Sequence, residues 1–270
     1  MIRERRVNVN GRQTRCLEAG AGWPLILLHA FPLNADMWRP QLEQVPDGWR
    51  FIAPDLRGFG PDARPTPGGS APTMDDFADD VAGLMDALEM PEATIGGLSM
   101  GGYVAFALCR RAPERFTGII LADTRPHADT PAAREARREM IALAEKEGSA
   151  AVAERMLPKL VGQTTTDSRP EVIAVIRRMI ESAPVAAITG ALAAMLGRPD
   201  STPELSAIGW PALVLVGAED EITPPAHAEG MQRALTRSRL VVIPEAGHLS
   251  SLEAPAMFSA ALADFLQSHI

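Results

Sequence analysis

Residues 93–102 read ATIGGLSMGG and set one serine, Ser99, among four glycines. The first six residues, Ala93–Leu98, form a short apolar run typical of a buried strand, and a helical pattern follows over Met100–Arg111. Residues 97–101 fit the pattern G-x-S-x-G, in which the serine projects from a sharp turn between a strand and a helix. The glycines leave room where neighbouring backbone passes closely. The stretch therefore predicts Ser99 as a nucleophile, provided that the rest of the chain supplies the groups that activate it.

Further apolar runs predict a mostly parallel sheet with helices on both faces, because these runs are continuous rather than alternating. The opening segment, Arg5–Leu17, alternates instead and contains Asn10-Gly11, a dipeptide that favours a tight hairpin at the edge of the sheet. Together these patterns give eight strands. The continuous runs, besides Ala93–Leu98, are Leu25–Ala30, Phe51–Leu56, Thr117–Ala122, Ala212–Gly217 and Leu240–Pro244. Core helices are expected after Thr73, over Met100–Arg111 and over Ala254–Gln267.

The strand pattern is interrupted between Pro126 and Ile208, where only helical patterns occur. We therefore expect a core formed by residues 1–125 and 209–270, with a helical cap, residues 126–208, inserted between the sixth and seventh strands. The helices expected in the cap are Pro131–Glu147, ended by Gly148, then Ser149–Val161, Pro170–Ser182 and Pro184–Leu196.

A serine needs a base to accept its proton. Of the five histidines, His248 follows the last strand and precedes the last helix, in a loop at the carboxyl end of a strand, where open α/β sheets place their sites. Asp220, just past Ala212–Gly217, is the acid expected to orient it. Glu219 and Glu221 are its neighbours and could serve instead, and Asp123 after Thr117–Ala122 is the main rival.

The other four histidines have no expected role in proton transfer. His29 ends a strand and is expected to hold the following loop by hydrogen bonds. His127 opens the cap, His227 begins a helix as a surface or capping residue, and His269 lies two residues from the last position of the chain, where exposure to solvent is expected.

Attack on a carbonyl places negative charge on its oxygen, which backbone N–H groups can stabilise. One N–H should come from Met100, the residue after the nucleophile. The other should come from the loop after Leu25–Ala30. Phe31 is the candidate there, because Pro32 has no N–H to donate.

Composition narrows the functional classes. The chain has 270 residues, 46% of them hydrophobic and 22% charged, which is ordinary for a globular protein. A net charge of −8 argues against nucleic-acid binding. No apolar run suits a signal peptide or a membrane span. Cys16 and Cys109 do not have the spacing of metal ligands and are expected to be reduced thiols, as in a cytoplasmic protein. We expect the protein to be a monomer or a homodimer.

Five segments taken together resemble the α/β-hydrolase superfamily: HAFPLNADMW, APDLRGFG, GGLSMGGYVA, LVGAEDEITPP and EAGHLSSLE, in this order. The chain is most similar to small bacterial carboxylesterases, cofactor-free perhydrolases and 3-oxoadipate enol-lactonases. The order of Ser99, Asp220 and His248 agrees with that of the superfamily. The resemblance implies these three as catalytic residues and Phe31 and Met100 as oxyanion donors. The chain departs from it at Ala30, where glycine is common.

The resemblance implies hydrolysis of a small carboxylic ester or lactone through an acyl-enzyme, with no metal or organic cofactor. Met156 and Leu160 of the cap and Trp38 of the core are candidate pocket residues, although helically spaced apolar residues are equally what a core requires. Arg125 could bind a substrate carboxylate, or pair with Asp123 or Asp129. A perhydrolase or C–C hydrolase would use the same three residues, and a non-hydrolytic receptor would keep the fold.

Overall fold

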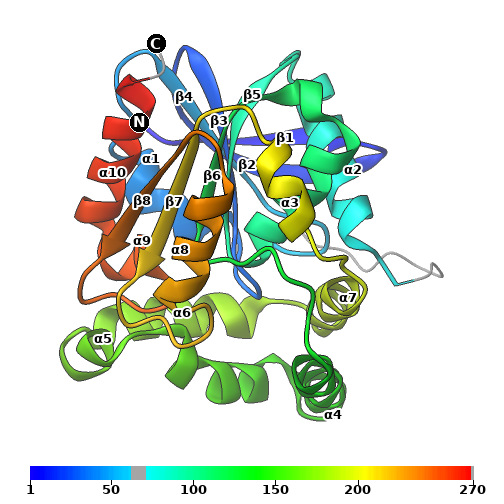
Figure 1. Ribbon diagram of the computed structural model, residues 1–270. Helices are drawn as coiled ribbons and strands as arrows, with labels where there is room; N and C mark the ends of the chain where they lie inside the picture. Colours follow the sequence, from blue (N-terminus) through cyan, green and yellow to red (C-terminus); the bar gives the residue numbers. More distant parts are fainter. Residues whose placement is uncertain (62–70, 269–270) are drawn as a thin grey trace.

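The computed structural model describes residues 1–61 and 71–268, and within this part eight strands form one sheet (Figure 1). The order is β1-β2-β4-β3-β5-β6-β7-β8. Strands β3 to β8 are parallel, and the β1–β2 hairpin joins the sheet through an antiparallel contact between β2 and β4. The mostly parallel eight-stranded sheet predicted from the sequence is confirmed. The strands are β1 (Arg3–Val9), β2 (Arg12–Gly20), β3 (Trp23–Leu28), β4 (Trp49–Pro54), β5 (Ala93–Leu98), β6 (Phe116–Ala122), β7 (Ala212–Gly217) and β8 (Ser238–Ile243).

The central strands of the sheet are buried on both faces. Every residue of β5 and of β7 is buried, which explains why these strands read as continuous apolar runs. At the edge, Asn10 and Gly11 both have positive φ, 50° and 82°, as a two-residue hairpin turn requires. The hairpin is thus specified locally, and the inner strands by burial.

Helices cover both faces of the sheet. α1 and α10 pack together over one face, and α2 and α3 pack together over the other (Figure 1). α2 begins at a capping box in which Thr73 accepts from the N–H of Asp76, while the Asp76 carboxylate accepts from the N–H of Thr73. The core helices are α1 (Arg39–Leu42), α2 (Met74–Ala87), α3 (Met100–Arg111), α8 (Pro225–Ala234), α9 (Ser250–Glu253) and α10 (Pro255–Gln267), with short 3₁₀ turns η1 (Ala35–Trp38), η2 (Pro113–Arg115) and η3 (Thr202–Ala207).

Two early strands end two residues sooner than their apolar runs suggest. β3 ends at Leu28 and β4 at Pro54, so that His29 and Asp55 lie in loops. The reason is that polar groups there have partners outside the ladder. The Leu56 N–H donates to His29 Nε2 at 2.9 Å, and the Asp55 carboxylate pairs with Arg15. The loops that leave the carboxyl ends of the strands are therefore cross-linked to each other.

Four helices lie between β6 and β7, next to the carboxyl ends of the strands (Figure 1). Gly148, with φ 80°, divides the first of them into two arms at the place where the sequence predicts a helix end. The second, a short polar helix, has no apolar stripe and was not predicted from the sequence. They are α4 (Pro131–Leu160), α5 (Gln163–Ser168), α6 (Pro170–Ser182) and α7 (Val185–Leu196), and α5 is the short polar one.

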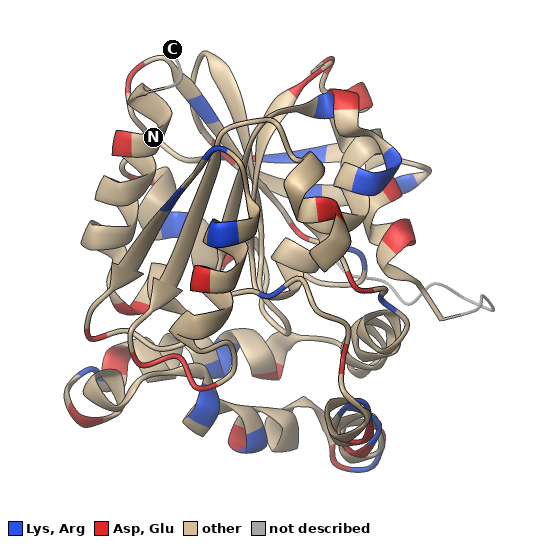
Figure 2. Cartoon of the chain, viewed as in Figure 1, with Lys and Arg blue, Asp and Glu red and all other residues tan. Residues whose placement is uncertain are grey.

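Acidic and basic side chains are interspersed over the core and over the four helices between β6 and β7 (Figure 2). Among the described residues, no single helix is long and apolar enough to cross a membrane. The pair α6 and α7 passes that test only jointly, and the two helices are bent by 94° relative to each other. His269 lies outside the described residues.

Candidate active site

Ser99 occupies a strained turn between β5 and α3. Its φ of 54° and ψ of −111° fall in a region that side chains rarely adopt. The turn is possible because backbone packs on backbone around it. A Cβ on Gly97 would lie 2.2 Å from the carbonyl carbon of Gly101, and a Cβ on Gly101 would lie 2.2 Å from the oxygen of Leu28. Both glycines are therefore required, and Ser99 stays partly exposed at the apex.

A continuous hydrogen-bonded chain connects Ser99 to a buried carboxylate. Ser99 Oγ lies 2.8 Å from His248 Nε2, and His248 Nδ1 lies 2.8 Å from Asp220 Oδ2. The other oxygen of Asp220 accepts from the N–H groups of Ile222 and Thr223. Burial alone would raise the pKa of Asp220, but His248 and the Thr223 hydroxyl hold that pKa below its usual range. Asp220 is therefore an anion that orients His248.

The backbone N–H groups of Phe31 and Met100 have no hydrogen-bond acceptor within residues 1–61 and 71–268. The loop that carries Phe31 is fixed by His29, whose Nδ1 lies 2.9 Å from the Ala30 oxygen. Burial lowers the pKa of His29 to about 4, so this ring is neutral near pH 7. Its Nδ1–H donates to Ala30 and its Nε2 accepts from Leu56. His29 thus holds the loop, as the sequence suggests.

The alternative acids have other partners. Asp123 accepts from the Gly217 N–H at 2.8 Å and from the Ser250 hydroxyl, and burial together with the nearby Asp220 raises its pKa well above the ordinary value. Glu219 accepts from the N–H and the hydroxyl of Thr164. Glu221 is exposed. Among the four acids considered from the sequence, Asp220 alone is hydrogen-bonded to His248.

Comparison with known proteins agrees with this geometry. The family model of the alpha/beta hydrolase fold matches residues 24–255. The chain belongs to the α/β-hydrolase family. A thermophilic esterase from Thermogutta terrifontis, solved with malate bound, is 42% identical over 99% of both chains with a TM-score of 0.91. The enol-lactonase from Burkholderia xenovorans LB400 is 27% identical over 97% of this chain and 100% of that chain, with a TM-score of 0.88.

A curated relative points the same way. The 3-oxoadipate enol-lactonase 2 of Acinetobacter baylyi is 29% identical over 238 residues, which are 88% of this chain and 86% of that protein. The α/β hydrolase described here is thus a hydrolytic enzyme with esterase and enol-lactonase relatives.

Two residues that the sequence predicts to line the pocket are buried in this α/β hydrolase. Trp38 is 1% exposed and packs on Phe258 of α10, with ring centroids 5.9 Å apart, and Leu160 is also 1% exposed. Both belong to the hydrophobic core, and their place in a substrate pocket stays a prediction. Their apolar character is explained by packing against the core.

Met156 is half-buried and lines a cavity of about 220 Å³ between the two arms of α4. Ile222, two residues from Asp220, closes the same cavity from the core side. Apolar Met140 and Leu143 share its wall with the charged side chains of Glu139, Arg155 and Lys159. The cavity therefore connects the cap of the α/β hydrolase to the loop that carries the acid.

Arg125 pairs with Asp129 at 3.0 Å, one of the alternatives that the sequence left open. Asp129 also binds Arg137 and Arg198, so that three guanidinium groups surround one carboxylate. Burial opposes its ionisation, but Arg137 and Arg198 lower the pKa of Asp129 to about 2. The cluster has an excess of positive charge. Neither Arg137 nor Arg198 was singled out from the sequence, because only Arg125 and Asp129 are close along the chain.

Two histidines lie near this arginine cluster. The rings of His127 and His227 are 5.6 Å apart, and burial, followed by the positive charge of Arg125, lowers the pKa of His227. The charge of Asp220 also acts on His227, in the opposite direction. The cluster is therefore electrostatically linked to the site that contains His248.

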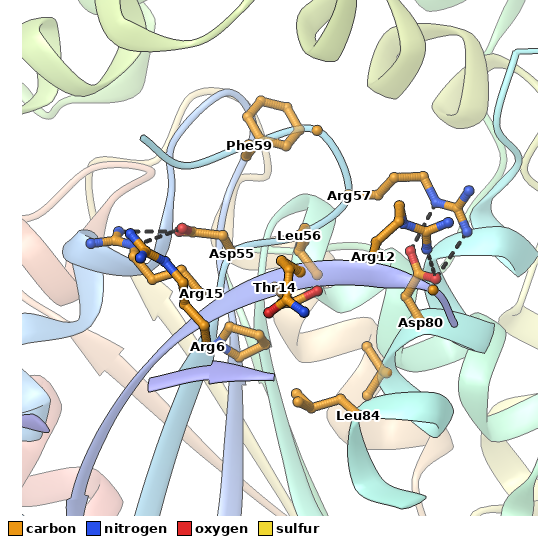
Figure 3. A pocket seen from close by; sticks show the side chains of 15 residues that line it. Arg6, Arg12, Thr14, Arg15, Asp55, Leu56, Arg57, Phe59, Asp80 and Leu84 are labelled. Carbon is orange, nitrogen blue, oxygen red and sulfur yellow. Dashed lines mark hydrogen bonds and ion pairs between the residues drawn. The ribbon is translucent and has the colours of Figure 1, made fainter. Parts of the chain in front are cut away.

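A cavity of about 550 Å³ lies between the β1–β2 hairpin, α2 and the loop after β4 (Figure 3). Its lining includes the apolar side chains of Phe59 and Leu84, which lie on opposite sides of it in Figure 3. Arg12 and Arg57 share the carboxylate of Asp80 on its wall, and Arg15 pairs with Asp55. Ser99 is not among the described residues that line it. This cavity is therefore distinct from the turn that carries Ser99.

Proposed function

We propose that this chain is a serine hydrolase that cleaves small carboxylic esters or lactones through an acyl-enzyme on Ser99. The observation that carries the proposal is the hydrogen-bonded series from Asp220 through His248 to Ser99, with both distances to the imidazole at 2.8 Å. A hydroxyl gains nucleophilicity from a base at this distance, and the base needs an oriented carboxylate behind it.

In the first half of the reaction, Ser99 Oγ attacks the carbonyl carbon while its proton passes to His248 Nε2. The carbonyl oxygen becomes negative and accepts hydrogen bonds from the N–H groups of Phe31 and Met100, which have no acceptor in the described protein. The C–O bond to the alcohol then breaks, and His248 gives the proton to the leaving oxygen. Asp220 stabilises the imidazolium in between.

In the second half, a water molecule replaces the alcohol. His248 takes a proton from the water, the hydroxyl attacks the acyl carbon, and the bond to Ser99 Oγ breaks as the serine recovers its proton. The products are the carboxylic acid and the free enzyme. Each proton that His248 accepts is returned within the same half-reaction, so no other acid or base is needed.

The direct test is the Ser99→Ala variant with a short-chain aryl ester. We expect the hydrolysis rate to fall by at least about 10⁴-fold, with His248→Ala similar and the double variant no worse, because the two residues act as a unit. Product formation and burst amplitude measure this. Wild-type hydrolysis by Ser99→Ala would refute the proposal.

A second candidate substrate, a lactone that carries a free carboxylate, is favoured by the arginine cluster. Three guanidinium groups around Asp129 leave positive charge unbalanced, and Arg125 is the most exposed of the three at 20%. A substrate carboxylate could pair with it by charge-assisted hydrogen bonds.

For this candidate, Arg125→Ala should raise KM for a carboxylate-bearing lactone roughly 10- to 100-fold and leave a neutral ester unaffected. Arg138→Ala is the matched control, because Arg138 pairs with Glu135 on the exposed side of α4. An equal rise of KM for both substrates would show that Arg125 acts only through its ion pair with Asp129. The remaining alternatives are a perhydrolase, a C–C hydrolase and a non-hydrolytic receptor. They are separated by assays of peracid formation, C–C cleavage and ligand binding beside those of esters and lactones, with Ser99→Ala as the blank.

A further inference from the structure

The carboxylate of Glu253, at the end of α9, is buried with the residue 2% exposed. Its Oε1 accepts from the N–H groups of Gly247 at 3.0 Å and Leu249 at 3.1 Å. Its Oε2 accepts from the N–H of Gly162 at 2.8 Å. The first two donors are the chain neighbours of His248 on either side, and the third belongs to the segment between α4 and α5. One carboxylate therefore joins the histidine loop to the cap.

We propose that Glu253 is a positioning residue of the hydrolytic site: it fixes the backbone on both sides of His248 and makes that geometry depend on the docked cap. This inference rests on the proposed function, in which His248 is the base. Hydrogen bonds from backbone N–H groups to a buried carboxylate are short and strong, and their loss leaves buried donors unsatisfied. His248 needs such support because its ring must stay aligned with both Ser99 and Asp220.

The contact between the two segments is tight beyond the hydrogen bonds. A Cβ on Gly247 would lie 2.3 Å from the nitrogen of Gly162, and a Cβ on Gly162 would lie 2.9 Å from the nitrogen of Gly247. Backbone thus packs directly on backbone at this point. A displacement of the cap here would displace the histidine loop.

We call residues 162–169 the cap strap, because further contacts attach them to the core. The Arg169 side chain donates to the backbone carbonyl oxygen of Glu253 at 2.7 Å and to that of Glu245 at 3.2 Å. Thr164 donates to Glu219, next to Asp220, through its N–H and its hydroxyl. The Thr164 contact attaches the strap without involving either neighbour of His248, which makes it a matched comparison.

Glu253→Gln tests the role of the carboxylate. A glutamine offers one acceptor oxygen where the carboxylate offers two, and its NH₂ group would face a backbone N–H. In either orientation a buried N–H at the junction of Gly162 and Gly247 loses its acceptor and meets the NH₂ group instead, and because the two backbones pack on each other the histidine loop is displaced. Thr164→Val removes the hydroxyl contact with Glu219 and leaves Glu253 intact. Both variants weaken the attachment of the strap, but only Glu253→Gln disturbs His248.

The measurements are kcat and KM for a short-chain aryl ester, together with the rate of phosphonylation of Ser99 by a small alkyl fluorophosphonate. We expect Glu253→Gln to lower kcat and the phosphonylation rate roughly 10- to 100-fold with KM nearly unchanged. Thr164→Val should stay within about 2-fold in both. Assays are made below the melting temperature of each variant, and Glu253→Asp, which keeps the charge but is shorter, replaces Glu253→Gln if the latter does not fold.

Two results would overturn the inference: wild-type kcat in folded Glu253→Gln, or an equal loss of kcat in Thr164→Val. The Ser99→Ala variant is assayed in parallel. If it retains hydrolysis, the proposed function itself fails. If it is inactive while Glu253→Gln is fully active, only the role given to Glu253 fails.

Discussion

Asp123 lies near Asp220 but is not part of the hydrogen-bonded series of Ser99, His248 and Asp220. Asp123 is fully buried, and burial and Asp220 raise its pKa well above 3.8. The native state therefore keeps a proton on Asp123 at pH values where the unfolded chain has lost it. Because the native state then binds more protons than the unfolded state, the free energy of unfolding falls as the pH rises from about 4 through the raised pKa.

Asp123→Asn should remove this pH dependence. The amide resembles the protonated acid: its oxygen can accept from Gly217 and its NH₂ can donate to Ser250. We expect the stability of the variant relative to wild type to increase with pH above about 4, by at most about 1.4 kcal/mol for each pH unit. Urea unfolding of both proteins from pH 4 to pH 9 measures the difference. A difference that is constant or declines with pH would contradict the protonated state.

At the residue scale, the sequence predicted which groups meet and named Asp220 as the acid, with Asp123 as its main rival. Ser99, Asp220 and His248 each follow a different strand, and the parallel sheet brings these strand ends to one edge. The same rule applies to Asp123, because β6 and β7 are neighbours. Only the side-chain directions separate the two aspartates, and strand patterns do not contain that information. Glu253 lies in the quoted segment EAGHLSSLE, but its long-range donor, Gly162, is 91 residues away.

At the scale of elements, the junction of Gly162 and Gly247 is a second place where a side chain does not fit. Gly247→Ala should lower the free energy of unfolding by a few kcal/mol and also lower kcat, because the new Cβ meets the Gly162 nitrogen at 2.3 Å. The control is Gly230→Ala in α8, where a Cβ has nothing within 4 Å. That change should stabilise the protein by about 1 kcal/mol, as expected inside a helix. Thermal and urea unfolding with steady-state kinetics give both quantities, and unchanged stability of Gly247→Ala would show that the junction can open.

The elements themselves were predictable where one local signal determines them. Asn10-Gly11 specifies the hairpin, Gly148 the break in α4, and the apolar run Ala93–Leu98 its strand. Direction and context could not be predicted in the same way. Periodicity identifies Trp38 and Leu160 as apolar, but it does not say whether they face a cleft or the core, and the structure buries both. The helix Gln163–Ser168 has no periodic signal, because its place is set by the strap contacts of Thr164 and Arg169.

At the scale of the whole molecule, the tryptophans provide a probe of one part only. All four tryptophans lie outside the helical range 126–208: they are Trp23, Trp38, Trp49 and Trp210. Tryptophan fluorescence therefore reports on the sheet and its helices, while circular dichroism at 222 nm reports on the helices of both parts, with about half of the helical residues in α4 to α7. Because the strap and Glu253 connect the two parts, we expect both signals to change at the same urea concentration.

Two separate transitions in the wild-type protein would contradict this coupling. In Glu253→Gln about half of the dichroism signal should be lost at a lower urea concentration than the fluorescence signal, because the cap then has one anchor fewer. Thr164→Val provides the comparison in which the fluorescence midpoint stays close to that of the wild type.

The insertion between β6 and β7 is attached to the core at its two ends and also at Gly162, which has a consequence for how this enzyme could diverge or be re-engineered. An insertion joined to its host only at its two ends can be exchanged as one cassette. Here the hydrogen bond from Gly162 to Glu253 divides the insertion into two segments. The first runs from the end of β6 to Gly162, and the second runs from Gly162 to the start of β7. A chimaera that exchanges only residues 127–160, and retains Val161-Gly162, would keep the contact of Gly162 with Glu253, but its new α4 would have to pack on α6 and α7 as the present one does.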